Sequence, residues 1–312
     1  MQVHTDIKNL PVFSNAVITT GTFDGVHTGH RQILDQLKWE ALMAGGESVV
    51  ITFDPHPRSV IPGNKQDIKL LSTLAEKIGL LSQLGIDHLV IVPFTLAFAG
   101  LSAEEYITEF LVNHFHPRCI ITGYDHHFGK ERKGNYQLLE EFGPEYGFSV
   151  KEIPEHILQH IAISSTRIRT ALLEGDIRTA NEFLGYPYFF SGSVVEGNKL
   201  GRTLGYPTAN LKISESNKLV PGNGVYAVTI KRESNQLKYG GMMNIGIRPT
   251  VDGTNRVTEV NIFDFDEDIY GRILNINILQ RLRNEEKFSG LEALKKQLAI
   301  DKKNALAVLN SK

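Results

Sequence analysis

The sequence predicts two consecutive domains, an α/β domain on a doubly wound parallel sheet and then a small antiparallel β-domain closed by a C-terminal helix. Up to about residue 185, apolar strand-like runs alternate with helical patterns, whereas short β-rich runs separated by turn residues follow. All eleven histidines precede residue 161. Residues 1–185 carry 15 basic and 22 acidic side chains, and residues 186–312 carry 18 and 13. This asymmetry indicates two units with different tasks.

The expected strands of the first half are continuous in their apolar content, as buried parallel strands are. They are residues 17–20, 48–53, 88–92 and 119–122. Helical spacing of apolar residues is found at 30–43, 73–84 and 103–115. Ligands of doubly wound sheets bind outside the carboxyl ends of the strands. Functional residues are therefore expected in the turns that follow the strands.

Five β-rich runs in the second half predict an antiparallel barrel or sandwich. They are residues 188–195, 224–230, 238–245, 258–263 and 273–282. A last helix is expected over about 289–309, where leucines and Ala305 recur at helical spacing. A helical pattern ends at the Gly and Pro residues of Leu184–Pro187. We therefore expect domains at 1–185 and 186–312.

The composition is that of a globular protein, with 41% apolar and 22% charged residues. No apolar run approaches the roughly 18 residues of a membrane span, and the N-terminus lacks the pattern of a signal peptide. Cys119 is the only cysteine, which excludes an internal disulfide and favours a reducing compartment, the cytoplasm. The net charge of −2 gives no reason to expect nucleic acid as a partner. We expect a monomer or a weak homo-oligomer without a membrane partner.

A glycine-rich segment at the first strand-to-helix turn is the strongest signal of a site. Residues 21–31 read Gly-Thr-Phe-Asp-Gly-Val-His-Thr-Gly-His-Arg. Its glycines allow backbone to approach a ligand, and the helix that follows offers free N–H groups to phosphate. His27 and His30 can reach one phosphate from the same side. The Gly-Lys-Ser/Thr ending of a P-loop is absent, and no thiol or third histidine stands at metal-ligand spacing.

This segment resembles the His-x-Gly-His signature of a nucleotidyltransferase superfamily, whose members transfer an ATP-derived nucleotidyl group to a phosphate and release pyrophosphate. The second signature of the superfamily is matched by residues 163–169, Ile-Ser-Ser-Thr-Arg-Ile-Arg. Hydroxyls at a helix start and a guanidinium one turn later suit β- and γ-phosphates, although Ser-Ser-Thr is also an ordinary N-cap. The resemblance implies catalytic roles for His27, His30 and Arg167. It implies ATP or phosphate contacts at Gly21, Thr22, Phe23, Asp24, Gly29, Ser164, Ser165 and Thr166.

Two further segments are similar to the bacterial flavin-adenylylating branch, where they shape the flavin and adenine pocket. Phe53–Pro57 follows the second expected strand, and Gly123–Lys130 follows the strand at 119–122. The resemblance implies flavin contacts at Asp54 and Asp125. His126 and His127 stand where Phe-Arg is common in that branch, and we expect two exposed loop histidines without a role.

The segment Gly192–Leu211 resembles the riboflavin kinase domain. It reads Gly-Ser-Val-Val-Glu-Gly-Asn-Lys-Leu-Gly-Arg-Thr-Leu-Gly-Tyr-Pro-Thr-Ala-Asn-Leu. A glycine-rich loop can wrap phosphates with its N–H groups. Thr208 and Asn210 offer neutral oxygens on one side of an extended segment, which suits Mg²⁺. The phosphate contacts that the resemblance implies are Gly197, Gly201 and Arg202.

Glu259 aligns with the carboxylate that serves the riboflavin kinase family as general base on the ribityl hydroxyl. The segments Gly246–Thr250 and Arg281–Glu285 also match that family and are expected to frame the flavin site, with Arg283 as a flavin contact. Asp264 to Asp268 are expected to form a solvated turn.

The resemblance extends from about Val17 to Leu298, with the motifs in the order of the bifunctional prokaryotic riboflavin kinase/FMN adenylyltransferase family. It implies a Rossmann-like nucleotidyltransferase domain followed by an antiparallel β-barrel kinase domain. Riboflavin and ATP would give FMN, and FMN and ATP would give FAD and pyrophosphate, both with Mg²⁺. Two alternatives remain: a chain with one active domain, and a flavin- or nucleotide-sensing protein without catalysis. A sensor is expected to lack His30 or Glu259, and both are present.

Overall fold

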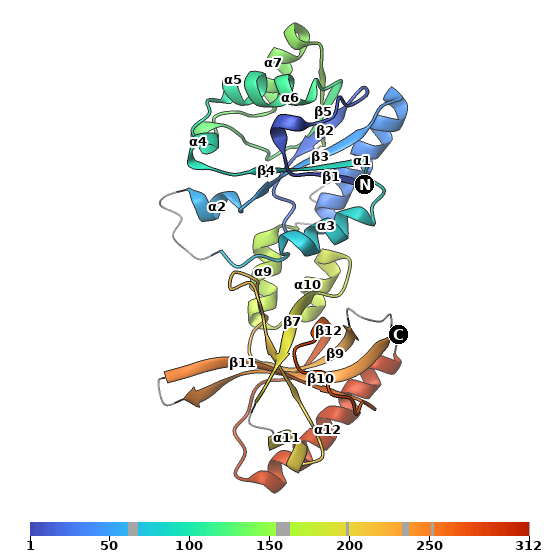
Figure 1. Cartoon of the computed structure of the whole chain (residues 1–312), viewed down its shortest axis with the longest axis vertical. Helices are drawn as coiled ribbons and strands as arrows, with labels where there is room; N and C mark the ends of the chain where they lie inside the picture. Colours follow the sequence, from blue (N-terminus) through green and yellow to red (C-terminus); the bar gives the residue numbers. More distant parts are fainter. Residues whose placement is uncertain (62–67, 154–162, 198–199, 233–236, 251–252, 312) are drawn as a thin grey trace. The chain divides into compact units, whose positions relative to one another are not determined.

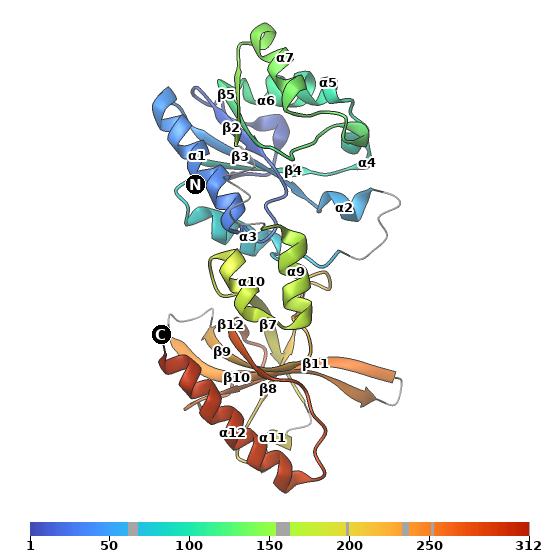
Figure 2. The same cartoon turned by 180° about the vertical axis from the view of Figure 1, so that it is seen from behind.

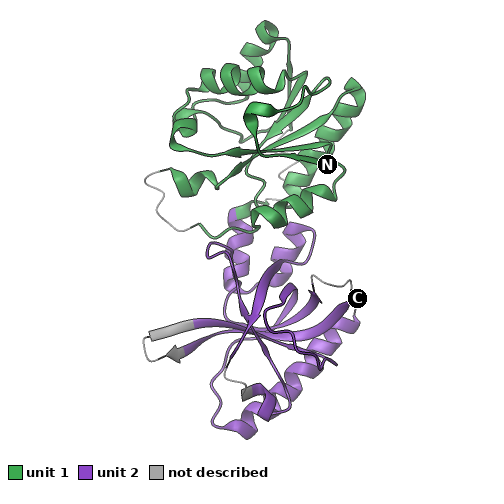
Figure 3. Ribbon diagram, viewed as in Figure 1, with its two compact units in different colours: residues 1–165 green, residues 166–312 purple. Residues whose placement is uncertain are grey.

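The computed structural model describes residues 1–61, 68–153, 163–197, 200–232, 237–250 and 253–311. The chain divides into two compact units, residues 1–165 and 166–312 (Figure 3). The division comes before the turn at Leu184–Pro187, and the helices between residue 166 and that turn belong to the second unit. In the described part of the chain, no helix is both long enough and apolar enough to cross a bilayer.

The first unit is built on a six-stranded sheet in which every pair of neighbouring strands is parallel (Figure 1). In spatial order the strands are β1 (Gln2–His4), β4 (His88–Pro93), β3 (Ser48–Asp54), β2 (Val17–Thr20), β5 (Cys119–Gly123) and β6 (Ser149–Ile153). The four strands predicted from apolar runs form the centre. The two edge strands, which are largely exposed, lack such a run and were missed.

Helices cover both faces of this sheet, which confirms the doubly wound α/β prediction (Figures 1 and 2). One apolar cluster joins alternate strand residues to α1 (Thr28–Ala44) and α3 (Leu74–Ser82). The other joins the opposite strand residues to a helical segment at 103–115 and to α7 (Tyr136–Tyr146). That helical segment consists of α5 (Ala103–Glu105), the π-helix η2 (Tyr106–Val112) and α6 (Asn113–Phe115). Short elements are η1 (Ile7–Asn9), α2 (Pro57–Val60), α4 (Leu96–Ala99) and η3 (Lys130–Arg132).

The second unit is a closed antiparallel barrel, so the barrel expectation is confirmed and the sandwich is excluded. Around the barrel the strands are β10 (Lys238–Thr250), β11 (Gly253–Ile262), β8 (Ala209–Lys212), β7 (Phe189–Val195), β12 (Ile273–Arg283) and β9 (Gly224–Arg232). The sequence predicted all of them except β8. With four residues, β8 is too short to show a periodicity.

Within the residues that the structure describes, four helices lie wholly or almost wholly in the second unit. They are α9 (Ser165–Glu174), α10 (Ile177–Leu184), α11 (Leu200–Thr203) and α12 (Leu291–Asn310). Asn181 of α10 donates from Nδ2 to the carbonyl of Ile278 at 3.0 Å, and its Oδ1 accepts from the amide of Tyr188 at 2.7 Å. Both contacts hold α10 against the barrel, which explains why this helix belongs to the second unit. The predicted C-terminal helix is confirmed as α12, whose Ala305 packs on Phe263 outside the barrel.

Candidate functional site

The loop after β2 holds the first motif at the carboxyl edge of the parallel sheet. The amide of Gly21 donates to the carbonyl of Ile51 on the neighbouring strand at 3.0 Å. Phe23, Gly25 and Val26 then take φ angles of 46°, 81° and 37°. These are left-handed conformations, which are costly for a bulky or β-branched residue. Phe23 and Val26 persist in them because both are buried in the apolar cluster beneath α1.

The two histidines lie at the N-terminus of helix α1, His27 as its N-cap and His30 in its first turn. His27 is the N-cap, and its Nδ1 accepts a hydrogen bond from the amide of His30 at 3.3 Å. The two rings stack with centroids 3.6 Å apart. A Cβ at Gly29 would lie 3.3 Å from Nδ1 of His27, so a side chain there would crowd the ring. The packing of the two rings therefore favours glycine at position 29.

His30 is neutral at pH 7. Its burial, with His27 and Lys77 nearby, holds its pKa well below the ordinary 6.5. Nδ1 of His30 is buried and has no hydrogen-bond partner among the residues that the structure describes. A neutral imidazole can donate or accept a hydrogen bond to a ligand but brings no charge of its own.

The start of the second motif, residues 163–165, lies against the first motif although the two are far apart in sequence. Ser165, the first residue of α9, donates from Oγ to the carbonyl of Asp24 at 3.1 Å. The carbonyl of Ile163 lies 4.0 Å from the Cβ position of Gly29. Ser164 is exposed beside Ser165. The first residues of the second motif are therefore brought to the first motif at the edge of the sheet.

Thr166 and Arg167 are the first residues of the second unit, and both are exposed. The guanidinium of Arg167 lies 5.8 Å from the ring centroid of Phe183. Their roles at adenylyl transfer stay predictions.

Asp24 shapes the loop from within. Its carboxylate accepts hydrogen bonds from the amides of Leu71 and Ser72 at 3.1 and 3.0 Å, and from the hydroxyl of Ser72 at 3.3 Å. The hydroxyl oxygen of Ser72 accepts in turn from the amide of Gly25 at 2.9 Å. Asp24 is only 1% exposed. Its side chain thus joins two loops, and a direct contact to ATP stays a prediction.

The residues expected to contact flavin flank this loop. Asp54 ends β3 and Asp125 follows β5, and the sheet order puts these strands on either side of β2. Both aspartates are exposed. They are thus close to the strand ends where the motif lies, as expected for a site at this edge.

The expectation of two exposed loop histidines is correct for His127 and wrong for His126. His126 is half-buried, and its Nε2 lies 3.1 Å from Oγ1 of Thr20 at the end of β2. The hydroxyl of Tyr106 donates to the same Oγ1 at 3.3 Å. Burial lowers the pKa of His126 to about 4, so the ring is neutral at pH 7. A side chain that reaches back onto a neighbouring strand carries no local sequence pattern.

Lys77 is a residue of this region that no motif identified. It lies on α3, is 6% exposed, and donates from Nζ to Oγ1 of Thr52 at 3.3 Å. That hydroxyl donates to the carbonyl of Thr22 in the motif loop at 3.2 Å. The sequence offered one signal of its burial. Lys77 stands four residues before the buried Leu81 and therefore lies on the apolar face of α3. Lysine is rarely placed on such a face.

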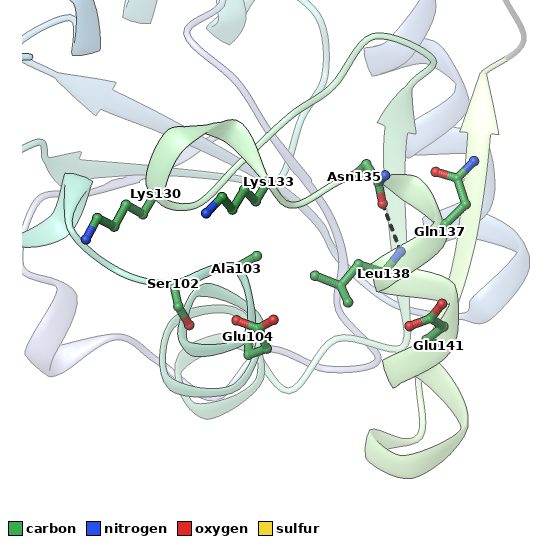
Figure 4. Close-up of a pocket in the computed structure, with 9 residues that line it drawn as sticks. All are labelled: Ser102, Ala103, Glu104, Lys130, Lys133, Asn135, Gln137, Leu138 and Glu141. Atoms are coloured by element: carbon green, nitrogen blue, oxygen red, sulfur yellow. Dashed lines mark hydrogen bonds between the residues drawn. The ribbon is translucent and has the colours of Figure 1, made fainter.

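A cavity of about 510 Å³ lies elsewhere on the first unit, between the starts of α5 and α7 and the turn η3 (Figure 4). Its lining consists of Ser102, Ala103, Glu104, Lys130, Lys133, Asn135, Gln137, Leu138 and Glu141. None of the predicted site residues lines it, although Lys130 ends one of the flavin-branch segments. It is therefore distinct from the loop at the strand ends.

In the second unit, the expected base and an expected metal ligand are neighbours across two strands. Glu259 of β11 pairs with Asn210 of β8 on one side and with Asn244 of β10 on the other. Side chains opposite each other on paired strands have Cβ atoms about 5 Å apart. The sequence separates these residues widely, and the barrel places them side by side.

The carboxylate of Glu259 is largely buried and paired with an arginine. Oε2 of Glu259 accepts a hydrogen bond from Nη2 of Arg248 at 2.7 Å. Burial raises the pKa of Glu259, and the guanidinium of Arg248 opposes this. The raised pKa brings the carboxylate closer to the proton affinity that a general base needs.

The glycine-rich loop of the kinase motif folds onto the segment Pro207–Asn210. A Cβ at Gly197 would overlap the side-chain amide of Asn210, whereas one at Gly201 would overlap the backbone carbonyl of Tyr206 and lie 3.3 Å from Oγ1 of Thr208. Glycine is thus required at position 201 by the close approach of backbone, whereas at position 197 the side chain of Asn210 would have to move. Thr208 and Arg202 are exposed, and Asn198 and Lys199 lie outside the described residues.

Arg283 makes a structural contact. Its Nε and Nη2 donate to the carboxylate of Asp301 at 2.9 and 2.8 Å, and Asp301 is 1% exposed. The pair fastens α12 to β12. A contact of Arg283 with flavin stays a prediction.

Comparison with known proteins adds the family. The FAD synthetase family model matches residues 10–167, and the riboflavin kinase model matches residues 184–309. The Haemophilus influenzae bifunctional riboflavin kinase/FMN adenylyltransferase is 36% identical over 300 residues, 96% of both chains. The chain belongs to this bifunctional riboflavin kinase/FMN adenylyltransferase family. The Bacillus subtilis member is 38% identical over 94% of this chain and 92% of its own.

A solved structure shares the fold of this chain over nearly its whole length. The crystal structure described as a macrolide-efflux protein from Streptococcus pneumoniae has a TM-score of 0.86 to this chain at 32% identity. The match covers 97% of each chain.

Proposed function

We propose that a domain of residues 1–185 transfers the adenylyl group of ATP to FMN and that a domain of residues 186–312 transfers the γ-phosphoryl group of ATP to riboflavin. Membership of the bifunctional family gives the chain both activities, riboflavin kinase and FMN adenylyltransferase. The observation that supports this assignment is that separated motifs meet within each of these two domains. Ser165 reaches Asp24 in the first, and Asn210 pairs with Glu259 in the second.

In the kinase reaction, Glu259 is proposed to accept the proton of the riboflavin 5′-hydroxyl. The hydroxyl oxygen forms a bond to the γ-phosphorus, the bond from that phosphorus to the β-phosphate oxygen breaks, and ADP leaves. Arg248 holds the carboxylate in place and in its ionised form. Gly197, Gly201 and Arg202 are proposed to contact the phosphates of ATP, in a loop whose N–H groups can face anions.

The residues of the second unit fit Mg²⁺. Thr208 and Asn210 offer neutral oxygens, and Asn210 stands opposite Glu259 on the paired strand. Such hard oxygens suit Mg²⁺ and leave positions for phosphate and water. Bound Mg²⁺ would neutralise phosphate charge during transfer. Across the described residues no group of three or more His, Cys, Asp or Glu side chains forms a metal site.

In the adenylyl transfer, an oxygen of the FMN phosphate is proposed to attack the α-phosphorus, with pyrophosphate as leaving group. His27, His30 and the N–H groups of residues 21–24 and 29 would stabilise the charge that develops on the phosphate oxygens. Ser164, Ser165, Thr166 and Arg167 are proposed to contact the leaving β- and γ-phosphates. Asp54 and Asp125 are proposed to bind the flavin. No proton needs to be removed, since the attacking phosphate is already ionised.

The proposed functional boundary remains 185/186, and the proposed location is the cytoplasm. A monomer or weak homo-oligomer acting on riboflavin, FMN and ATP is proposed. Incubation of the chain with riboflavin, ATP and Mg²⁺, followed by chromatography, tests the function. FMN should appear first and FAD after it. Accumulation of FMN alone would favour one active unit, and binding without either product would favour a sensor.

A further inference from the structure

Lys77 is a buried cation with one neutral partner. Its Nζ donates to Oγ1 of Thr52, and no carboxylate of the described residues forms an ion pair with it. An ammonium group carries three donors, so two remain without a partner in the described structure. Burial of an unpaired charge is unfavourable, and buried lysines are almost always paired. A methionine would fill the same space without that penalty, so packing alone does not account for a lysine here.

The ammonium lies beside the adenylyl-transfer loop. Thr52, its partner, stands two residues before the end of β3 and is bonded to the carbonyl of Thr22. Burial lowers the pKa of Lys77, and the carboxylates of Asp24 and Asp54 act in the opposite direction. Lys77 in turn helps to lower the pKa of His30. The hydrogen bonds from Lys77 to Thr52 and from Thr52 to Thr22 place the ammonium next to the motif loop at the strand ends.

Neither nearby aspartate satisfies the charge. The Asp24 carboxylate is held by Leu71 and Ser72, and Asp54 is exposed. Close by, Nδ1 of His30 is also buried without a partner in the described residues. Unmatched polar atoms on two different elements, α1 and α3, thus border the same loop.

We infer that Lys77 is a ligand for a substrate phosphate group at the Gly21–His30 loop. The inference rests on the proposed assignment of adenylyl transfer to the first unit. A lysine binds phosphate as a point charge, and its effect is greatest where water is excluded. The phosphate belongs either to ATP, where charge develops on the α-phosphate and on the leaving pyrophosphate, or to FMN. Either one supplies the anion that the buried ammonium lacks.

The test uses the full chain with Lys77→Met, which keeps the length of the side chain but removes its charge, and with Lys77→Arg, which keeps the charge. Lys38→Met is the matched control, because Lys38 on α1 pairs with Asp35 at the surface. Lys77→Met should lower kcat/KM for FMN adenylylation by about 10²–10³-fold, as loss of one stabilising donor does. Lys77→Arg should recover part of the rate. Lys38→Met should match the wild type.

Two further readouts separate phosphate binding from a structural role. Riboflavin phosphorylation on the same Lys77→Met preparation should be unchanged, since it belongs to the second unit. The unfolding temperature should stay the same or rise, because an unpaired buried charge has been replaced by an apolar group of similar size. A structural lysine would instead give a lower unfolding temperature.

The substrate dependence identifies the phosphate. A rise in the KM for FMN alone assigns Lys77 to the FMN phosphate. A fall in kcat with weaker inhibition by added pyrophosphate assigns it to the phosphates of ATP. FMN adenylylation within about threefold of wild type, or loss of activity together with a lower unfolding temperature, would overturn the inference. FAD formation by the wild type is measured in the same series, so failure of the proposed function itself would be seen separately.

Discussion

Replacement of Glu259 by glutamine should abolish most riboflavin phosphorylation and leave the barrel folded. Glutamine keeps the shape of the side chain, and its Oε1 can still accept a hydrogen bond from Nη2 of Arg248. In the wild type this nitrogen lies 2.7 Å from Oε2 of Glu259. What is lost is the group that accepts the proton of the riboflavin hydroxyl. Loss of a general base costs about 10²–10⁴ in rate, equivalent to about 2.7–5.5 kcal/mol of activation free energy.

The stability change should be much smaller than the change in rate. The side chain of Arg248 is 37% exposed, so the ion pair is partly screened by solvent and contributes about 1 kcal/mol or less. Burial disfavours the charged form of Glu259 and raises its pKa. A neutral amide at this position therefore loses the attraction to Arg248 but also avoids the unfavourable burial of a charge. The free energy of unfolding should therefore change by about 1 kcal/mol or less.

The assay measures riboflavin phosphorylation and FMN adenylylation on one Glu259→Gln preparation. Adenylylation should be normal for two reasons. Its nucleophile is a phosphate that is already ionised, and the reaction is assigned to the other unit. Glu267→Gln is the matched control: Glu267 also pairs with an arginine, Arg232, but is 55% exposed. Normal phosphorylation by Glu259→Gln would refute the base assignment. Loss of both activities would indicate misfolding.

The pH profile supplies a companion test. The base acts as a carboxylate, so phosphorylation should fall as the pH decreases through the pKa of Glu259, which burial raises. Arg248→Met removes the cation that lowers this pKa, and the acid limb should therefore move to higher pH. An unchanged limb would mean that another group controls it.

Three further predictions concern the rest of the chain. His30→Ala should reduce FAD formation by about 10²–10³-fold while FMN formation continues; an FAD rate within a few-fold of wild type would leave His30 only a structural role. Asp301→Ala should lower the free energy of unfolding by about 3–5 kcal/mol in urea titrations, because it strands the partly buried guanidinium of Arg283; a smaller loss would mean that solvent reaches the pair. Fragments 166–312 and 186–312 should both phosphorylate riboflavin, but 186–312 should unfold at lower urea because it lacks α10 and its hydrogen bonds to the barrel. Equal midpoints would show that α10 adds no stability.

The sequence alone determined the features that local periodicity and short motifs express. Apolar runs marked the four central strands of the sheet, since parallel strands buried on both faces must be apolar throughout. Short β-rich runs marked five of the six barrel strands. The motif at 21–31 and the one at 192–211 marked the turns that we propose to carry chemistry, and at Gly201 the structure shows a close backbone approach that demands glycine.

Only the tertiary structure decided which residues meet. Closure of the barrel put Asn210 beside Glu259, and Arg248 on the neighbouring strand against its carboxylate. The packing of α3 on the sheet brought Lys77 to Thr52, and the fold turned His126 back onto β2. These contacts depend on strand register and on helix packing across long stretches of chain. A local pattern reports which face of an element is buried, but it contains no information about the partner that the face will meet.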